Sequence, residues 1–134
     1  MHRFLFSLSL LFTFISLAAA DGDKPVIAVL GDSYSTFQGH VTPERNELWY
    51  FSPAKYNTDV DARDQCWWAI LTAPDKPYQL GVNNSYSGAT ICFTGYHGDD
   101  FTDRSFVTRM YNLGDPDIIL ILGATNDSWA NSPI

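Results

Sequence analysis

The sequence predicts an α/β domain with a parallel sheet, and three observations lead to this prediction. Short, largely apolar runs occur at 25–30, 78–83 and 117–122. Two segments with helical spacing of apolar residues separate these runs, and each run leads into a turn of small or polar residues. The order strand, helix, strand, helix, strand is typical of layered α/β domains.

The first and third runs indicate strands most clearly. Residues 25–30 and 118–122 are apolar on both faces instead of alternating, which is typical of parallel sheets covered by helices. The run at 78–83 is a weaker strand candidate that leads into Ser85-Tyr86-Ser87-Gly88.

Capping residues predict where the two helices begin. The first begins at Asp61, with Asp64 three residues later, and ends before Pro74. The second begins at Asp103 and ends at Gly114. Their predicted apolar faces are Cys66, Trp67, Ile70 and Leu71 in the first helix, and Phe106, Val107, Met110 and Tyr111 in the second.

The connection at 36–60 is long for a segment without regular structure. Connections of this length are usually functional loops or lids, and an ordered surface loop without ligand contact is the alternative.

Residues 1–20 predict a secretory signal peptide. A basic start is followed by an uncharged apolar run, and Ala18-Ala19-Ala20 supplies an A-x-A cleavage signal. The run is shorter than the ~20 residues of a membrane-spanning helix, and an uncleaved N-terminal anchor is the alternative. We therefore expect export to the periplasm or the extracellular space, without stable membrane insertion after cleavage.

The composition is acidic. Loss of Arg3 with the signal peptide leaves 7 basic against 15 acidic residues, a net charge of −8 with His neutral. Without a Lys/Arg cluster, this charge argues against nucleic acid and anionic membranes as partners and fits a neutral or sugar-like substrate.

Cys66 and Cys92 are the only cysteines. An exported protein permits a disulfide between them, and two reduced, buried thiols are the alternative. Neither cysteine has the spacing of a metal ligand.

The turns after the three runs carry groups suited to acyl transfer, which needs an activated hydroxyl and donors for the oxyanion. Ser33 offers a hydroxyl and its own N–H, Gly88 an N–H without a side chain in the way, and Asn126 a neutral amide. These turns share the sheet edge at which ligands bind in open α/β sheets. The alternatives are an ordinary turn serine, a turn glycine and a helix cap. Asp32 and Asp127 are predicted to be structural.

The blocks Gly31-Asp32-Ser33, "NSYSGAT" and "GATND" resemble, in order and spacing, those of the SGNH hydrolases, also called the GDSL family. The resemblance implies a three-layer α/β/α fold with a parallel, flavodoxin-like sheet. It also implies that Ser33 is the nucleophile, and that the Ser33 N–H, the Gly88 N–H and the Asn126 amide form the oxyanion hole. No metal or organic cofactor is implied.

Two departures from the family pattern matter. Ala124 stands where the family usually has glycine. The catalytic base of the family is a histidine in an Asp-x-x-His block near the end of the domain, and the sequence has no such block. His40 and His97 match no catalytic block. We expect the base beyond residue 134, and residues 21–134 to be the N-terminal portion of the domain, because two helices could hardly cover both faces of 118–122.

The resulting hypothesis is an exported serine hydrolase that cleaves an acyl or acetyl ester, with a carbohydrate or similar small molecule as substrate. Trp49 and Trp129 are candidates for the wall of the substrate site. A non-catalytic glycan-binding module on the same fold, or an inactive fragment without the histidine, are the alternatives.

Overall fold

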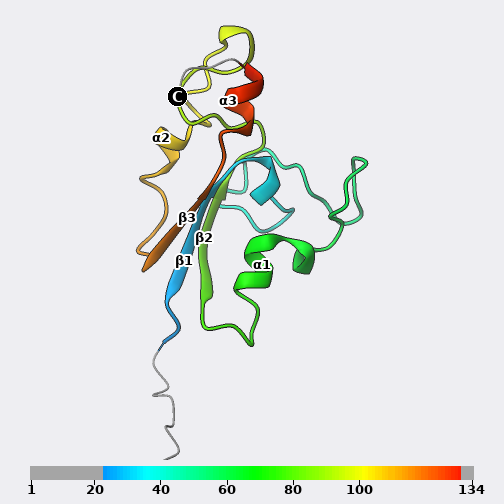
Figure 1. Ribbon diagram of the computed structural model, residues 1–134, viewed down its shortest axis with the longest axis vertical. Helices are drawn as coiled ribbons and strands as arrows, with labels where there is room; N and C mark the ends of the chain where they lie inside the picture. The colour runs from blue at the N-terminus through cyan, green and yellow to red at the C-terminus, as the bar shows by residue number, and fades with distance from the viewer. Residues whose placement is uncertain (1–22, 131–134) are drawn as a thin grey trace, which may run out of the picture.

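The computed structural model describes residues 23–130, and its centre is a parallel three-stranded sheet (Figure 1). The strands are β1 (Val26–Gly31), β2 (Gln79–Ser85) and β3 (Ile118–Leu122), in the order β2-β1-β3. This arrangement confirms the predicted α/β fold and parallel sheet. The predicted signal peptide lies outside the described residues.

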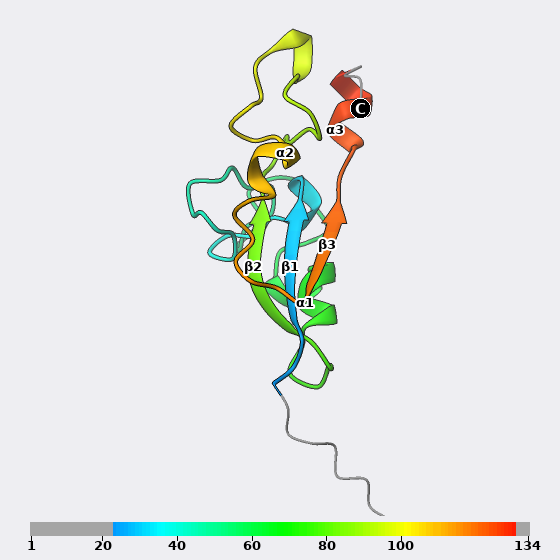
Figure 2. The ribbon, with the colours of Figure 1, turned by 90° about the vertical axis from the view of Figure 1, so that its left-hand side faces the viewer.

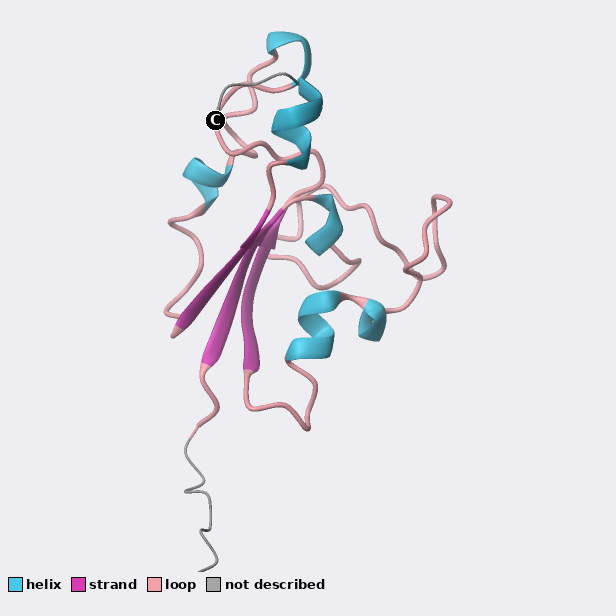
Figure 3. Ribbon diagram, viewed as in Figure 1, coloured by secondary structure: helices cyan, strands magenta, loops and turns pink. Residues whose placement is uncertain are grey.

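One short helix packs on each face of the sheet. α1 (Trp67–Leu71) and α2 (Phe106–Arg109) lie on opposite faces, and α3 (Thr125–Ala130) lies beyond the carboxyl ends of the strands (Figures 2 and 3). Successive residues of β1 alternate between two cores. Ile27 and Val29 pack in the cluster that contains Trp68 of α1, whereas Ala28 and Leu30 pack in the cluster that contains Phe106 of α2.

The first helix is shorter than predicted, and its buried face is different. The Gln65 side chain accepts the N–H groups of Asp61 and Ala62, which closes a 3₁₀ turn at Arg63–Gln65 before α1 begins. Asp61 therefore does not cap the helix. Trp68 is fully buried, whereas Ile70 and Leu71, predicted to face the core, are exposed.

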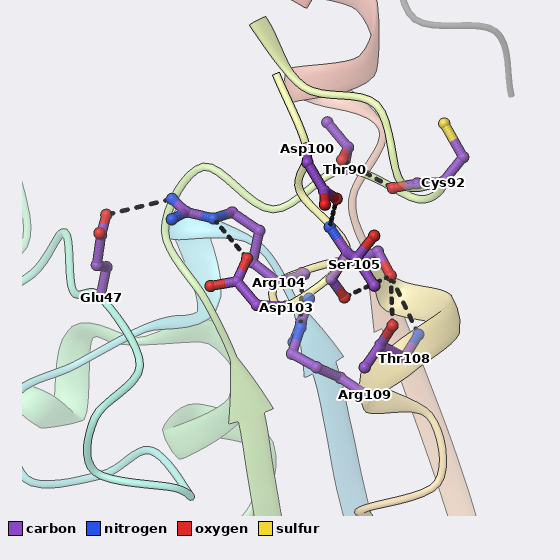
Figure 4. Close-up of polar contacts among 10 residues, drawn as sticks. Glu47, Thr90, Cys92, Asp100, Asp103, Arg104, Ser105, Thr108 and Arg109 are labelled. Atoms are coloured by element: carbon purple, nitrogen blue, oxygen red, sulfur yellow. Dashed lines mark hydrogen bonds and ion pairs between the residues drawn. The ribbon is translucent and has the colours of Figure 1, made fainter. Parts of the chain in front are cut away.

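The second helix also begins later than predicted. Ser105, not Asp103, is the N-cap, because its hydroxyl accepts the N–H of Thr108 at 3.1 Å (Figure 4). The Asp103 carboxylate instead lies 3.4 Å from Nε of Arg104. Of the predicted apolar stripe only Phe106 is buried, since Val107, Met110 and Tyr111 are exposed.

The face of the sheet beside α2 is incompletely covered. Here Val107 and Met110 border an open apolar groove of about 350 Å³ that continues onto Ile119 and Ile121 of β3. Ile119, Ile121 and Leu122 of β3 are exposed in the described structure. None of the helices within residues 23–130 is long and apolar enough to cross a membrane.

The two cysteines do not form a disulfide with each other. Cys66 is 2% exposed in the core beside α1, and burial raises the pKa of its thiol to about 11. Cys92 is half-buried in the segment after β2. The structure therefore differs from the pairing considered from the sequence, and Cys66 packs as a small apolar side chain.

Candidate active site

The turn after β1 is held by the backbones of both neighbouring strands. The Asp32 N–H donates to the Leu122 carbonyl, and the Tyr86 N–H donates to the Gly31 carbonyl, each at 3.1 Å. Gly31 admits no side chain, because a Cβ there would lie 2.4 Å from the Cβ of Ser35. The turn therefore presents Ser33 at the carboxyl end of the central strand.

Asp32 caps this turn and has the structural role predicted for it. One carboxylate oxygen, Oδ1, accepts the Tyr34 N–H at 3.1 Å, which closes the 3₁₀ turn Ser33–Ser35. The other, Oδ2, is buried without a hydrogen-bond partner in the described structure. Burial raises the pKa of Asp32, although the nearby charge of Arg109 opposes this rise.

Arg109 supports the same strand end, and sequence reasoning missed it. Its guanidinium, in a residue only 4% exposed, donates to the carbonyls of Gly31 at 3.1 Å and Asn84, while Nε donates to Arg104 at 2.8 Å. Burial lowers its pKa to about 10. An arginine three residues after Phe106 would be read as solvent-facing, because nothing local in the sequence shows that three carbonyls surround it.

The turns after β2 and β3 are joined by side chains. The Asn126 amide donates from Nδ2 to the Ala89 carbonyl at 2.9 Å, and both Asp127 oxygens accept the Ile91 N–H, at 2.9 and 3.0 Å. Asn126 lies in the first turn of α3 and bonds no helical N–H, so it is not the helix cap that was the alternative. Asp127 has a structural role, as predicted.

Two residues give these turns their unusual backbone. Gly88 has a φ of +79°, in the left-handed region that favours glycine. Ala124 has a φ of +78° although it carries a side chain, at the position where the family pattern has glycine. Glycine is instead required one residue earlier, because a Cβ on Gly123 would lie 2.3 Å from Cζ of Phe106.

A pocket of about 200 Å³ lies where the three turns meet. It brings together the predicted nucleophile, the predicted oxyanion donors and both predicted wall residues. Its lining consists of Ser33, Tyr34, Trp49, Ser87, Gly88, Tyr96, Asn126 and Trp129. Trp129 is 67% exposed at the rim. Of the predicted site residues, only the two cysteines lie outside this lining.

The donors in this pocket are available for a ligand. Within residues 23–130, neither the N–H of Ser33 nor that of Gly88 donates to a protein acceptor, and the Ser33 hydroxyl has no hydrogen-bond partner. Oxyanion stabilisation needs such donors, fixed in advance and aimed at one point. Ser33, Gly88 and Asn126, which follow three different strands, therefore all line the pocket that contains the serine hydroxyl.

The two described histidines do not belong to this pocket. His40 packs near Phe37 and Trp68, with ring centroids 6.0 Å apart in each pair. His97 is exposed in the 3₁₀ turn Tyr96–Gly98. The described chain thus places no histidine against Ser33. It also contains no group of three or more His, Cys, Asp or Glu side chains that could hold a metal ion.

The connection at 36–60 reaches the pocket through Trp49. The Trp49 N–H donates to Oγ1 of Thr36 at 2.9 Å, and the Trp49 ring stacks on Tyr56 with centroids 4.8 Å apart. Phe37 and Tyr50 anchor the connection in the core. Trp49 therefore brings this segment to the Ser33 pocket, which favours the first of the two interpretations, a functional loop.

A serine at the end of the central strand, beside polar turns that follow both neighbouring strands, is the arrangement expected of the hydrolase family that the sequence resembles. The family model for GDSL-like Lipase/Acylhydrolase matches residues 25–134. The chain belongs to that family. No curated protein matches the sequence.

Two crystal structures resemble the chain. A GDSL-like lipase from Bacteroides ovatus is 53% identical with a TM-score of 0.80, and the match covers 84% of this chain and 54% of that one. A GDSL-like lipase from Bacteroides uniformis is 51% identical with a TM-score of 0.77, with coverages of 83% and 52%. The chain therefore spans about half the length of the solved structures that it matches.

Proposed function

We propose that the full-length protein is a serine hydrolase that cleaves an ester through an acyl-enzyme. The observation that carries the proposal is the pocket that Ser33, Gly88 and Asn126 line together, in which the Ser33 hydroxyl and the N–H groups of Ser33 and Gly88 have no protein partner within residues 23–130. Family membership supports a hydrolase, and the local geometry supports an acyl group as the reacting centre.

In the proposed mechanism, Oγ of Ser33 attacks the ester carbonyl while its proton passes to a histidine expected beyond residue 134. The N–H groups of Ser33 and Gly88 and the Asn126 amide stabilise the oxyanion. Collapse of this tetrahedral species breaks the ester C–O bond, and the leaving alkoxide takes the proton from the histidine. Water then attacks the acyl-enzyme by the same route and releases the acid and Ser33.

An ester on a carbohydrate is the substrate class that we propose. A second, wide groove begins at Tyr34 and Trp49, which also line the Ser33 pocket, and continues to Asn57–Asp59. Sugars present apolar ring faces and hydroxyl groups together, so an aromatic wall followed by polar side chains suits a leaving group of that kind. The acyl group would occupy the smaller pocket.

We also propose that the protein is exported. This proposal rests on the signal-peptide pattern of residues 1–20. A fusion of residues 1–20 to a reporter that acts only outside the cytoplasm would test it, and retention of the reporter in the cytoplasm would contradict it.

A glycan-binding module without catalysis is the second candidate. It is favoured by the Ser33 hydroxyl, which has no base beside it within residues 23–130. The two candidates differ in the sequence that follows residue 134, since a hydrolase requires an Asp-x-x-His block there and a binding module does not.

Replacement of the nucleophile tests the proposal. In the full-length protein, Ser33→Ala should reduce turnover of 4-nitrophenyl acetate by at least about 10³-fold, because no other group can form the acyl-enzyme. Ser128→Ala, a change at an exposed serine of α3, is the matched control and should retain wild-type turnover. Undiminished turnover by Ser33→Ala would refute the proposal.

A further inference from the structure

Tyr96 is held in the pocket by a tight hairpin that follows β2. Thr94 and Asp100 form an antiparallel bridge, and the Gly95 N–H donates to the Asp99 carbonyl at 2.9 Å. The Tyr96 ring packs edge-on against Phe101 with centroids 5.8 Å apart. Gly95 makes this packing possible, since a Cβ there would lie 2.4 Å from the Phe101 ring.

The hydroxyl of Tyr96 donates to Oδ1 of Asn126 at 2.6 Å. The other end of the same amide, Nδ2, donates one hydrogen to the Ala89 carbonyl. Asn126 is 3% exposed, so these contacts replace water around the amide. With Oδ1 occupied by Tyr96 and one N–H by Ala89, the second N–H is the group that Asn126 offers to the pocket.

This orientation decides whether Asn126 stabilises or repels an oxyanion. An amide turned by 180° would present Oδ1, a hydrogen-bond acceptor, to the negative oxygen. The Tyr96 hydrogen bond opposes that rotation. It also draws electron density toward Oδ1, and hydrogen bonds linked in this way strengthen one another, so the N–H becomes a better donor.

We propose that Tyr96 is a positioning residue of the oxyanion hole, whose hydroxyl fixes and polarises the Asn126 amide. This inference rests on the proposed hydrolase function, because it assigns Tyr96 a role in the same reaction. Tyr96 must be protonated to act, and burial, reinforced by the charges of Asp32 and Asp127, raises the pKa of its phenol. It therefore remains a donor at neutral pH.

Kinetics of Tyr96→Phe in the full-length protein test this role. The change removes the hydroxyl and keeps the ring that packs on Phe101. We expect kcat for 4-nitrophenyl acetate to fall about tenfold while KM stays within about twofold, because the lost contact acts on the transition state. Tyr111→Phe, at a tyrosine that is 81% exposed, is the matched control and should leave both constants unchanged.

A double-mutant cycle separates action through Asn126 from a general effect on structure. In an Asn126→Ala background, Tyr96→Phe should have little further effect on kcat, because the amide that it orients is gone. A full additional loss in that background would overturn the proposal, and so would wild-type kcat for Tyr96→Phe alone. Either result would leave the proposed hydrolase function intact. If the wild-type protein showed no turnover that depends on Ser33, both the role of Tyr96 and the hydrolase function would be overturned.

A spectroscopic measurement keeps the proposal falsifiable if the variants lose stability. The side-chain amide resonances of Asn126 in the full-length protein report its hydrogen bonds directly. They should shift upfield in Tyr96→Phe and remain in place in Tyr111→Phe. Unchanged Asn126 resonances in a folded Tyr96→Phe protein would overturn the assignment.

Discussion

The turns after β1 and β3 lie at the same end of the sheet and are held in different ways. The first is fixed by backbone hydrogen bonds to both neighbouring strands and by the guanidinium of Arg109. The second is tied to the turn after β2 by the side chains of Asn126 and Asp127, with Ala124 in a left-handed conformation. Ser33, the proposed nucleophile, is thus positioned mainly by backbone hydrogen bonds to the neighbouring strands, whereas Asn126, the proposed oxyanion donor, is positioned by side-chain hydrogen bonds.

The largest effect is expected at Arg109, which supports the first turn. Arg109→Met would leave buried carbonyls without their donor and should lower the free energy of unfolding by about 3 kcal/mol. Arg45→Met, at an exposed arginine, is the matched control. Denaturant melts of the full-length variants measure both, and equal stability of the two would show that the first turn does not depend on the buried cation.

A smaller loss is expected at Gly123, in the second turn. Gly123→Ala would place a Cβ against the ring of Phe106. Overpacking of this kind typically lowers the free energy of unfolding by about 1–3 kcal/mol. Because Asn126 lies three residues later, turnover should fall together with stability. Wild-type stability of this variant would mean that Phe106 moves aside and that the turn is not sterically fixed.

The charge of Asp32 should make the first turn sensitive to pH. Burial raises the folded-state pKa of this carboxyl above its usual 3.8, so the native state binds the proton more tightly than the unfolded state. The contribution of this carboxyl to the free energy of unfolding is therefore fully present below pH 3.8, and it is lost as pH rises through the folded-state pKa.

Asp32→Asn removes the ionisable carboxyl, so the variant does not lose stability through its ionisation as pH rises. The Asn side chain still has an oxygen that can accept the Tyr34 N–H. The melting temperature of the variant, relative to wild type, should rise as pH increases from below 3.8 to neutral. A difference that is constant with pH would contradict the raised pKa.

The smallest effect is expected at Ala124. A left-handed backbone conformation is unfavourable for alanine, so glycine at this position would remove strain from the folded state. Glycine also gives the unfolded chain more conformational freedom, which partly offsets this gain in stability. Ala124→Gly should therefore stabilise the full-length protein by at most about 1 kcal/mol. A loss of stability, measured by the same denaturant melts, would show that the surrounding turn is adapted to the methyl group.

The strands and the site blocks were predictable because their signals are local. Apolar runs mark β1 and β3, and small or polar residues mark the turns after all three strands, while the resemblance of these blocks to the SGNH hydrolases singled out Ser33, Gly88 and Asn126. The helices were predicted too long, because Asp61 and Asp103 resemble caps while Gln65 and Ser105 make the hydrogen bonds that decide the helix starts.

Arg109 and Tyr96 could not be predicted, because their roles depend on contacts distant in sequence. Arg109 reaches Gly31 across 78 residues, and Tyr96 reaches Asn126 across 30. Nothing beside either residue in the sequence distinguishes it from a surface side chain. The predicted roles of Ser33, Gly88 and Asn126 in catalysis remain predictions that the pocket geometry supports.

Covalent labelling of Ser33 tests the central claim most directly. The full-length protein, treated with a fluorophosphonate, should gain one adduct on the peptide that contains Ser33, because the oxyanion donors activate attack on phosphorus as they do on carbon. Asn126→Ala should react more slowly, and Ser33→Ala should not react. An adduct on another serine, or equal labelling of Ser33→Ala, would contradict the account.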